Sequence, residues 1–197
     1  MRDSRRIPEI VARINGHTIN SVVSFESHWS GPRGKSRSRL TISINRGIIF
    51  PELLYQSSGS VLIQVISRDY RLAEQETVFD GVVLEVTVDP IRRLLHFHNH
   101  DYSIRLSKVS HPESFFNQTS SGIVRMVADR HGLDSNIWET SELIGSVREG
   151  DSSQMLLSDH SRRTDEWSLL TYLAELEGYS LFFEGNKLVF GPPGVIG

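Results

Sequence analysis

The stretch TDEWSLLTYLAELEGYSLFFEGNKLVF, residues 164–190, contains the clearest helix and hairpin in this sequence. Its apolar residues recur at helical spacing and share one face of the predicted helix: Trp167, Leu170, Leu173, Ala174 and Leu176. Thr164 or Asp165 is suited to cap the start of this helix, and Gly178 ends it. Two apolar runs then flank Gly185-Asn186, a dipeptide that accepts a tight β-turn. The stretch therefore predicts a helix followed by a β-hairpin.

A second helix is predicted over SSGIVRMVADRHGL, residues 120–133. Ile123, Met126 and Val127 fall on one face of it, a serine at 120 or 121 is in position to cap its start, and Gly132 follows its end. Residues 133–160 have weak periodicity and many polar side chains, so we expect a loop with at most one strand. The second half of the chain, residues 101–197, is thus predicted to be a small α+β domain.

The first half, residues 1–100, is predicted to be all β. EIVARINGHTINSVVSFES (9–27) is expected to form two strands around Asn15-Gly16. Four further strands are expected in SRLTISIN (38–45), SVLIQVIS (60–67), ETVFDGVVLEVTVD (76–89) and RRLLHFHNH (92–100). Gly81 indicates a bulge or bend, and FPELLY (50–55) a short helical turn. Six short antiparallel strands favour a small barrel or sandwich.

Three histidines alternate in LLHFHNHD, residues 94–101. In a strand, His96, His98 and His100 point to one face about 7 Å apart, and imidazole is a common nitrogen ligand for transition metals. Leu95 and Phe97 take the opposite face, which we expect to be the core, so the histidines should face water, a lumen or a neighbouring subunit. Because the first and third histidines are too far apart to share an ion, we expect no metal and no cofactor. The three histidines are the candidate ligands if a metal were bound.

Catalytic residue types form no recognisable motif in this sequence. Further metal ligands would have to converge from elsewhere, and His111, Asp101 and Asp89 are the candidates. The run LSDHSRR sets an aspartate, a histidine and a serine side by side at 159–161, but adjacent side chains diverge, whereas catalytic triads are assembled from distant segments. The chain has no cysteine, which excludes disulfides and thiolate chemistry. We therefore predict that the chain is not an enzyme and has no catalytic residue.

Positive charge is gathered near one end of the chain. Residues 1–40 contain eight Arg or Lys and three acids, a balance of +5, which leaves −8 for the rest of a chain whose net charge is −3. Arg33, Lys35, Arg37 and Arg39 lie in GPRGKSRSR (31–39), which we interpret either as a long solvated hairpin loop or as a loop that reaches a neighbouring subunit. This pattern favours docking to protein chains over sequence-specific nucleic-acid binding, because nucleic-acid-binding domains are usually basic overall. No apolar run approaches the ~20 residues that span a bilayer.

Three groups of residues occur in an order that is found in a known family. They are Phe79, Gly81 and Val83 in a strand; Ala128, Arg130, His131, Gly132 and Leu133 at a helix end; and Thr164, Asp165, Trp167, Leu170, Leu173, Ala174 and Gly178 in a second helix. In these positions the sequence resembles the phage late control protein D family of baseplate hub proteins. That family is related to the N-terminal hub part of type VI secretion spike proteins. The likeness covers roughly residues 8–193.

The resemblance implies a tail-tube-like antiparallel β-barrel over residues 1–100 and an α+β hub domain over 101–197. The family generally adds a second barrel after these domains. This sequence ends at FGPPGVIG, where that barrel would begin, so we expect it to be absent or truncated here.

The resemblance also implies a structural role in a virion tail or baseplate assembled in the host cytoplasm. There the chain would act as a hub or tail-tip protein, whose ring joins the tail tube to the central spike of a phage or contractile injection machine. The implied partners are other copies of the chain in a trimer, the tail tube protein, the spike protein and, as a further candidate, the tape-measure protein. We take Arg33, Lys35, Arg37 and Arg39 as subunit-interface candidates. The alternative is a His-based metal-dependent hydrolase or a tail-associated peptidase.

We predict that the purified chain binds no stoichiometric metal, because the histidine row lacks converging ligands. Elemental analysis should find far less than one zinc or iron ion per chain. About one ion per chain, lost when His96, His98 and His100 are all replaced by alanine, would contradict this prediction and favour the metal-dependent hydrolase.

Overall fold

The computed structural model describes residues 9–19, 21–31, 33–44, 60–66, 75–110, 115, 117–144 and 165–194. The chain divides into two compact units. The first consists of the residues up to Trp29 together with Ser36–Asp101, and the second of Ser30–Lys35 together with the residues from Tyr102 onward. The sequence places one boundary after residue 100, whereas here a short segment from the first half, 30–35, also belongs to the second unit. The turn expected in FPELLY lies outside the described residues.

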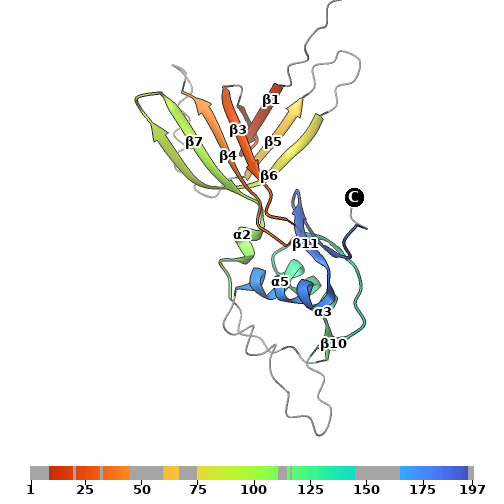
Figure 1. Cartoon of the computed structure of the whole chain (residues 1–197). Coiled ribbons are helices and arrows are strands. Elements are labelled where there is room, and N and C mark those ends of the chain that lie inside the picture. The colour runs from red at the N-terminus through yellow and green to blue at the C-terminus, as the bar shows by residue number, and fades with distance from the viewer. Residues whose placement is uncertain are drawn as a thin grey trace, which may run out of the picture. The chain divides into compact units, whose positions relative to one another are not determined.

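The first unit is an antiparallel sheet of seven strands in the order β2-β1-β5-β6-β7-β4-β3 (Figure 1). Its strands are β1 (Glu9–Ile14), β2 (His17–Ile19), β3 (Val22–His28), β4 (Arg37–Ser43), β5 (Ser60–Ile66), β6 (Gln75–Asp89) and β7 (Leu94–His100). Where the sequence predicts two strands around Asn15-Gly16, the structure has three, because β2 ends after three residues and β3 then begins. Asn15 and Gly16 form the expected turn, both with positive φ.

Hydrogen bonds between the described strands do not close this sheet, and β2 and β3 are its edges. In a flat sheet β1 and β3 would be about 24 Å apart, since five strand spacings of about 4.8 Å separate them. Their Cα atoms nevertheless approach within 8 Å, so the sheet is strongly curled. The curled face encloses one core, formed by Ala12, Ile14, Ile19, Leu40, Ile42, Phe79, Val83, Leu95 and Phe97. An open, curled sheet therefore takes the place of the predicted barrel, within a fold that is mainly β as predicted.

Gly81 lies where β6 passes the last residue of β7. A Cβ atom at this position would be 2.1 Å from the carbonyl oxygen of His100, so only glycine fits here. The register of β6 shifts elsewhere, against β5 at Ile63/Gln64 and against β7 at Val83/Glu85. Gly81 thus allows two backbones to approach closely. The bulge predicted at this glycine lies instead two residues further along β6, where the register shift begins at Val83.

In its described residues, the second unit combines three helices with two small sheets (Figure 1). The helices are α2 (Ser103–Leu106), α3 (Ser120–Arg130) and α5 (Glu166–Glu177), and the strands are β8 (Gln118–Thr119), β9 (Asp134–Ile137), β10 (Leu143–Ile144), β11 (Ser180–Glu184) and β12 (Lys187–Gly191). β12 lies between β11, its antiparallel hairpin partner, and β9, with which it pairs in parallel. Two strands therefore occur in residues 133–144, where at most one was predicted. None of the described helices is long and apolar enough to cross a membrane.

Helix α5 forms as its sequence predicts, with one change on its apolar face. The side chain of Asp165 accepts a hydrogen bond from the backbone N–H of Ser168 (3.0 Å), and Gly178 ends the helix with a φ of 68°. Leu176, predicted to be in the core, is 57% exposed, and Leu169 is buried in its place. In α3 the cap is Thr119 rather than either serine that follows it.

We predict that Trp167→Ala destabilises the protein by about 3–5 kcal/mol, the usual range for removing a large aromatic from a core. Trp167 is 4% exposed and stacks on Phe183, with ring centroids 6.0 Å apart. Leu176→Ala, on the exposed side of the same helix, is the matched control and should change stability by less than about 0.5–1 kcal/mol. Urea unfolding of both variants checks this, and equal losses for the two would contradict the burial of this helix face.

Candidate functional site

Polar side chains cover the face of the sheet that lies opposite its core. Strand pairing aligns them in three rows: Ser24, Thr41, His96 and Thr87; Glu26, Arg39, His98 and Glu85; and His28, Arg37 and His100. The alternation of side chains along each strand produces this arrangement. Leu95 and Phe97 are buried on the opposite side at 8% and 0% exposure, which confirms that the histidine row faces away from the core. We call this polar side the outer face.

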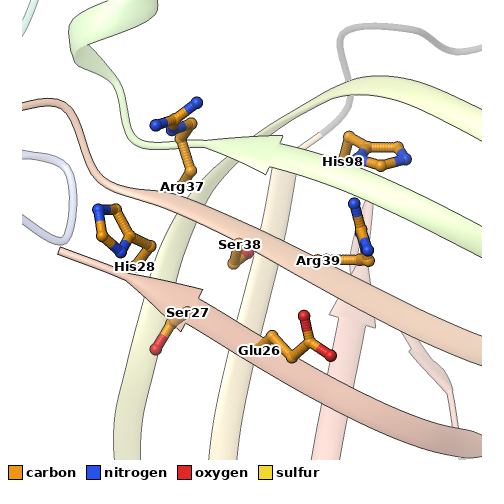
Figure 2. Close-up of a pocket in the computed structure, with 7 residues that line it drawn as sticks. All are labelled: Glu26, Ser27, His28, Arg37, Ser38, Arg39 and His98. Carbon is orange, nitrogen blue, oxygen red and sulfur yellow. The ribbon is translucent and has the colours of Figure 1, made fainter. Parts of the chain in front are cut away.

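A hollow of about 450 Å³ opens on the outer face beside the edge strand β3 (Figure 2). Its lining residues come from three neighbouring strands: Glu26, Ser27 and His28 of β3; Arg37, Ser38 and Arg39 of β4; and His98 of β7. In Figure 2, the side chains of His28, Arg37, Arg39 and His98 rise from the same side of these strands, whereas Ser27 points the other way. The structure thus brings one residue of the histidine row together with two of the basic residues that the sequence singled out.

Arg37 and Arg39 give this hollow its positive charge. They lie two residues apart on β4, which separates them by about 7 Å along the strand. Both are exposed, and neither forms a hydrogen bond or ion pair with the part of the chain that the structure describes. Glu26 is the residue directly opposite Arg39 on β3, yet no ion pair joins their side chains. Two arginines without a contacting carboxylate are suited to bind an anion.

The other two basic candidates lie in the second unit. Arg33 donates a hydrogen bond from Nε to the carbonyl oxygen of Tyr179 (2.8 Å) and a longer one from Nη2 to that of Ala174 (3.5 Å). These carbonyls flank the C-terminal end of α5, where a cation is favourable to the helix dipole. Lys35 is half-buried and accepts a hydrogen bond from Ser30 Oγ through its backbone oxygen.

The segment predicted as one basic loop is therefore divided between two places. Residues 37–39 belong to strand β4, and Arg33 is fixed within its own chain. The expectation of a single solvated loop over residues 31–39 is wrong for this reason. Arg37 and Arg39 remain available to a neighbouring protein, and the role of all four residues at a subunit interface stays a prediction.

The residues considered as metal ligands do not gather at one point. His96 Nδ1 lies 3.0 Å from Thr41 Oγ1 on the next strand. Asp89 pairs in register with Leu94, about 13 Å along β7 from His98. The Asp101 carboxylate is buried and accepts a hydrogen bond from the backbone N–H of Ser36 (2.5 Å). No three His, Asp or Glu side chains cluster at metal-binding distance among the described residues. His111 and residues 159–161 lie outside them.

A group of three ionisable side chains in the second unit joins two helices. Glu166, 3% exposed at the start of α5, accepts a hydrogen bond from Arg130 Nη1 (2.6 Å) and another that involves Nε2 of His131. Arg130 is the last residue of α3 and His131 is its C-cap. Because the buried Glu166 and these two side chains satisfy one another, the arrangement is typical of a structural ion pair.

A surface ion pair on the same unit has a clear electrostatic effect. Arg125 Nη2 lies 2.6 Å from Glu139 Oε1, and Ser121 Oγ donates to the other carboxylate oxygen (3.1 Å). The hydrogen bond from Arg125, followed by that from Ser121, lowers the pKa of Glu139 below its ordinary value. This carboxylate is exposed, so the pair serves to fix the segment after β9 on α3 rather than to bury a charge.

Sequence reasoning missed Glu26 and His28 as members of the hollow. Both lie in the strand VVSFESH, where polar and apolar residues do not alternate regularly. The pairing register of this strand also shifts between Val22 and Ser24. Their neighbours on β4 are known only once the pairing register is known. The signal that could have found them is the exposed polar positions 24, 26 and 28 at a spacing of two.

No family model matches the sequence, and no curated protein sequence is similar to it. Solved structures are similar over nearly the whole chain. The tail protein from Neisseria meningitidis MC58 has a TM-score of 0.63 at 16% identity, with 93% of this chain and 50% of that chain covered. The 43 kDa tail protein of prophage MuSo2 from Shewanella oneidensis has a TM-score of 0.60 at 16% identity, with 94% and 56% covered. The PdpA-VgrG complex of Francisella is less similar, at a TM-score of 0.49 and 13% identity over 93% of this chain and 31% of that chain.

Both of the first two structures are named as tail proteins, the second of them from a prophage, and this chain spans about half of their length. At 16% identity the agreement establishes a shared fold. The predicted fold class, mainly β with an α+β part, is therefore confirmed, and these tail proteins share the fold.

We predict that Arg33→Ala destabilises the second unit by about 1–3 kcal/mol, because it removes charged hydrogen bonds to two carbonyls at the end of α5. Lys35→Ala removes the same charge two residues away and should cost less than about 0.5 kcal/mol. Urea unfolding measures the total loss, and amide hydrogen exchange in the last turn of α5 locates it. Unchanged exchange in that turn would contradict the role of Arg33.

Proposed function

We propose that this chain is a structural protein of a phage tail or a related contractile injection machine, and that it acts at the baseplate hub. In this role a ring of copies, a trimer by the family resemblance, joins the tail tube to the central spike. The observation that carries the proposal is the fold agreement with two tail proteins over 93–94% of the chain, which includes both units. The matched family positions, from Phe79 to Gly178, support the finer assignment to a hub.

The surfaces of the first unit are consistent with such a role. One face of its sheet is a core, and the other carries rows of Arg, His, Glu and Thr side chains that are suited to contact protein neighbours. The tail tube protein, the spike protein and the tape-measure protein are the proposed neighbours. The proposed location is the virion tail or baseplate, and the proposed role includes no catalytic step.

We predict that the protein is present in purified particles at a copy number that is a multiple of three per tail. Quantitative mass spectrometry against a tail component of known copy number measures this. Deletion of the gene in the producing strain should yield particles without functional tails, because the connection between tube and spike is missing, and the wild-type gene should restore them.

Two outcomes would contradict the proposal. One is absence of the protein from intact particles, and the other is normal assembly of tails without it. A variant with His96, His98 and His100 replaced by alanine is the matched control for the enzyme alternative. It should restore tails as well as the wild type does, whereas a metal-dependent hydrolase would lose its activity in the same variant.

A further inference from the structure

The hollow on the outer face holds two arginines that form no ion pair with any described residue. Arg37 and Arg39 are exposed, lie about 7 Å apart on one side of β4, and make no ion pair with the described chain. Like charges held at such spacing repel each other, and an anion between them would relieve this. A guanidinium also offers a planar pair of donors that matches the two oxygens of a carboxylate or phosphate.

The size and lining of the hollow fit a small anionic group. Its volume of about 450 Å³ leaves room for a carboxylate group. His28 and His98 add ring nitrogens near the two arginines. The donors come from three adjacent strands of one sheet, so the sheet holds them in fixed relative positions.

The charges around the hollow favour a carboxylate over a nucleic acid. Glu26 lies opposite Arg39 on one side, and Glu85 lies opposite His98 on the other. The next row along the strands contains Thr41 and His96 but no arginine or lysine. A phosphate backbone needs an extended track of cations, whereas these two arginines are bounded by carboxylates. One or two carboxylates fit this pattern.

We propose that the hollow is a binding site for the carboxylate side chains of an acidic peptide segment from a neighbouring protein chain. The binding of an acidic peptide does not depend on the proposed function. Only the assignment of the neighbouring chain to a tail rests on it. Two sources share this chemistry: a second copy of the chain, whose residues 41–197 carry a net charge of −8, and a different protein.

The first experiment measures binding of a fluorescein-labelled hexaglutamate peptide to the full chain by fluorescence anisotropy at low salt. Replacing both Arg37 and Arg39 by alanine should weaken binding about tenfold or more, since it removes charge-assisted hydrogen bonds. The matched control replaces Arg92 and Lys187 by alanine, which removes two exposed positive charges elsewhere, and should change binding less than about twofold.

Two further variants make the test specific to this site. Glu26→Gln should strengthen binding, because it removes a negative charge from the lining. Arg37→Lys with Arg39→Lys keeps the charge but loses the paired donors, so its binding should be intermediate. Circular dichroism of each variant verifies that the chain is folded.

The two sources are separated by sedimentation of the chain alone across a range of salt concentrations. Self-association that salt and the double alanine variant both abolish identifies a second copy as the source, and a monomer that binds the peptide identifies a different protein. The proposal is overturned if the peptide does not bind, or if the double alanine variant binds it like the wild type. It is also overturned if single-stranded DNA of equal charge binds more tightly with the same dependence on Arg37 and Arg39, or if only inorganic phosphate binds.

Discussion

A buried carboxylate determines how the second unit is assembled. Glu166 is the first residue of α5. Its carboxylate accepts a hydrogen bond from Arg130, the last residue of α3, and forms a second one with the ring of His131, the C-cap of that helix. Both charges also complement the helix dipoles, an acid at the start of one helix and a base at the end of the other. Of this group only Glu166 is fully buried, so removal of Arg130 would leave a buried carboxylate with less compensation. The core between these helices and the β11-β12 hairpin therefore depends on this junction. It also joins two blocks of the family resemblance, 128–133 and 164–178, in one contact.

The elements that the sequence predicted well are those whose signals are local. The cap, the final glycine and four of the five predicted apolar core positions of α5 lie within 15 residues and agree with the structure. The histidine row was assigned to the correct face because alternation in a strand needs no knowledge of its neighbours. Leu176 was wrongly placed in the core, since a helix with apolar residues on most sides does not specify which side packs.

The features that the sequence did not predict depend on contacts between distant segments. Curling of the sheet brings β1 near β3, and strand order and register decide this rather than any one stretch. Glu26, Arg39 and His98 meet because three strands pair in a particular register. Arg33 was predicted to point toward another subunit, because nothing near it in sequence reveals that its hydrogen-bond acceptors lie beyond residue 170. About half of the hollow was thus named in advance, and its assembly into one site was not.

The hydrogen bonds of Arg33 have a consequence for the order of folding during synthesis. Its partner carbonyls, at Ala174 and Tyr179, are 141 and 146 positions further along the chain. At about 5–20 residues per second, a ribosome releases them roughly 7–29 s after Arg33. Throughout that interval the segment Ser30–Lys35 has been synthesised, but most of the second unit, to which it belongs, has not. Early and late parts of the chain must therefore meet before the second unit is complete, so a nascent chain arrested before residue 174 would leave this N-terminal segment without its binding place.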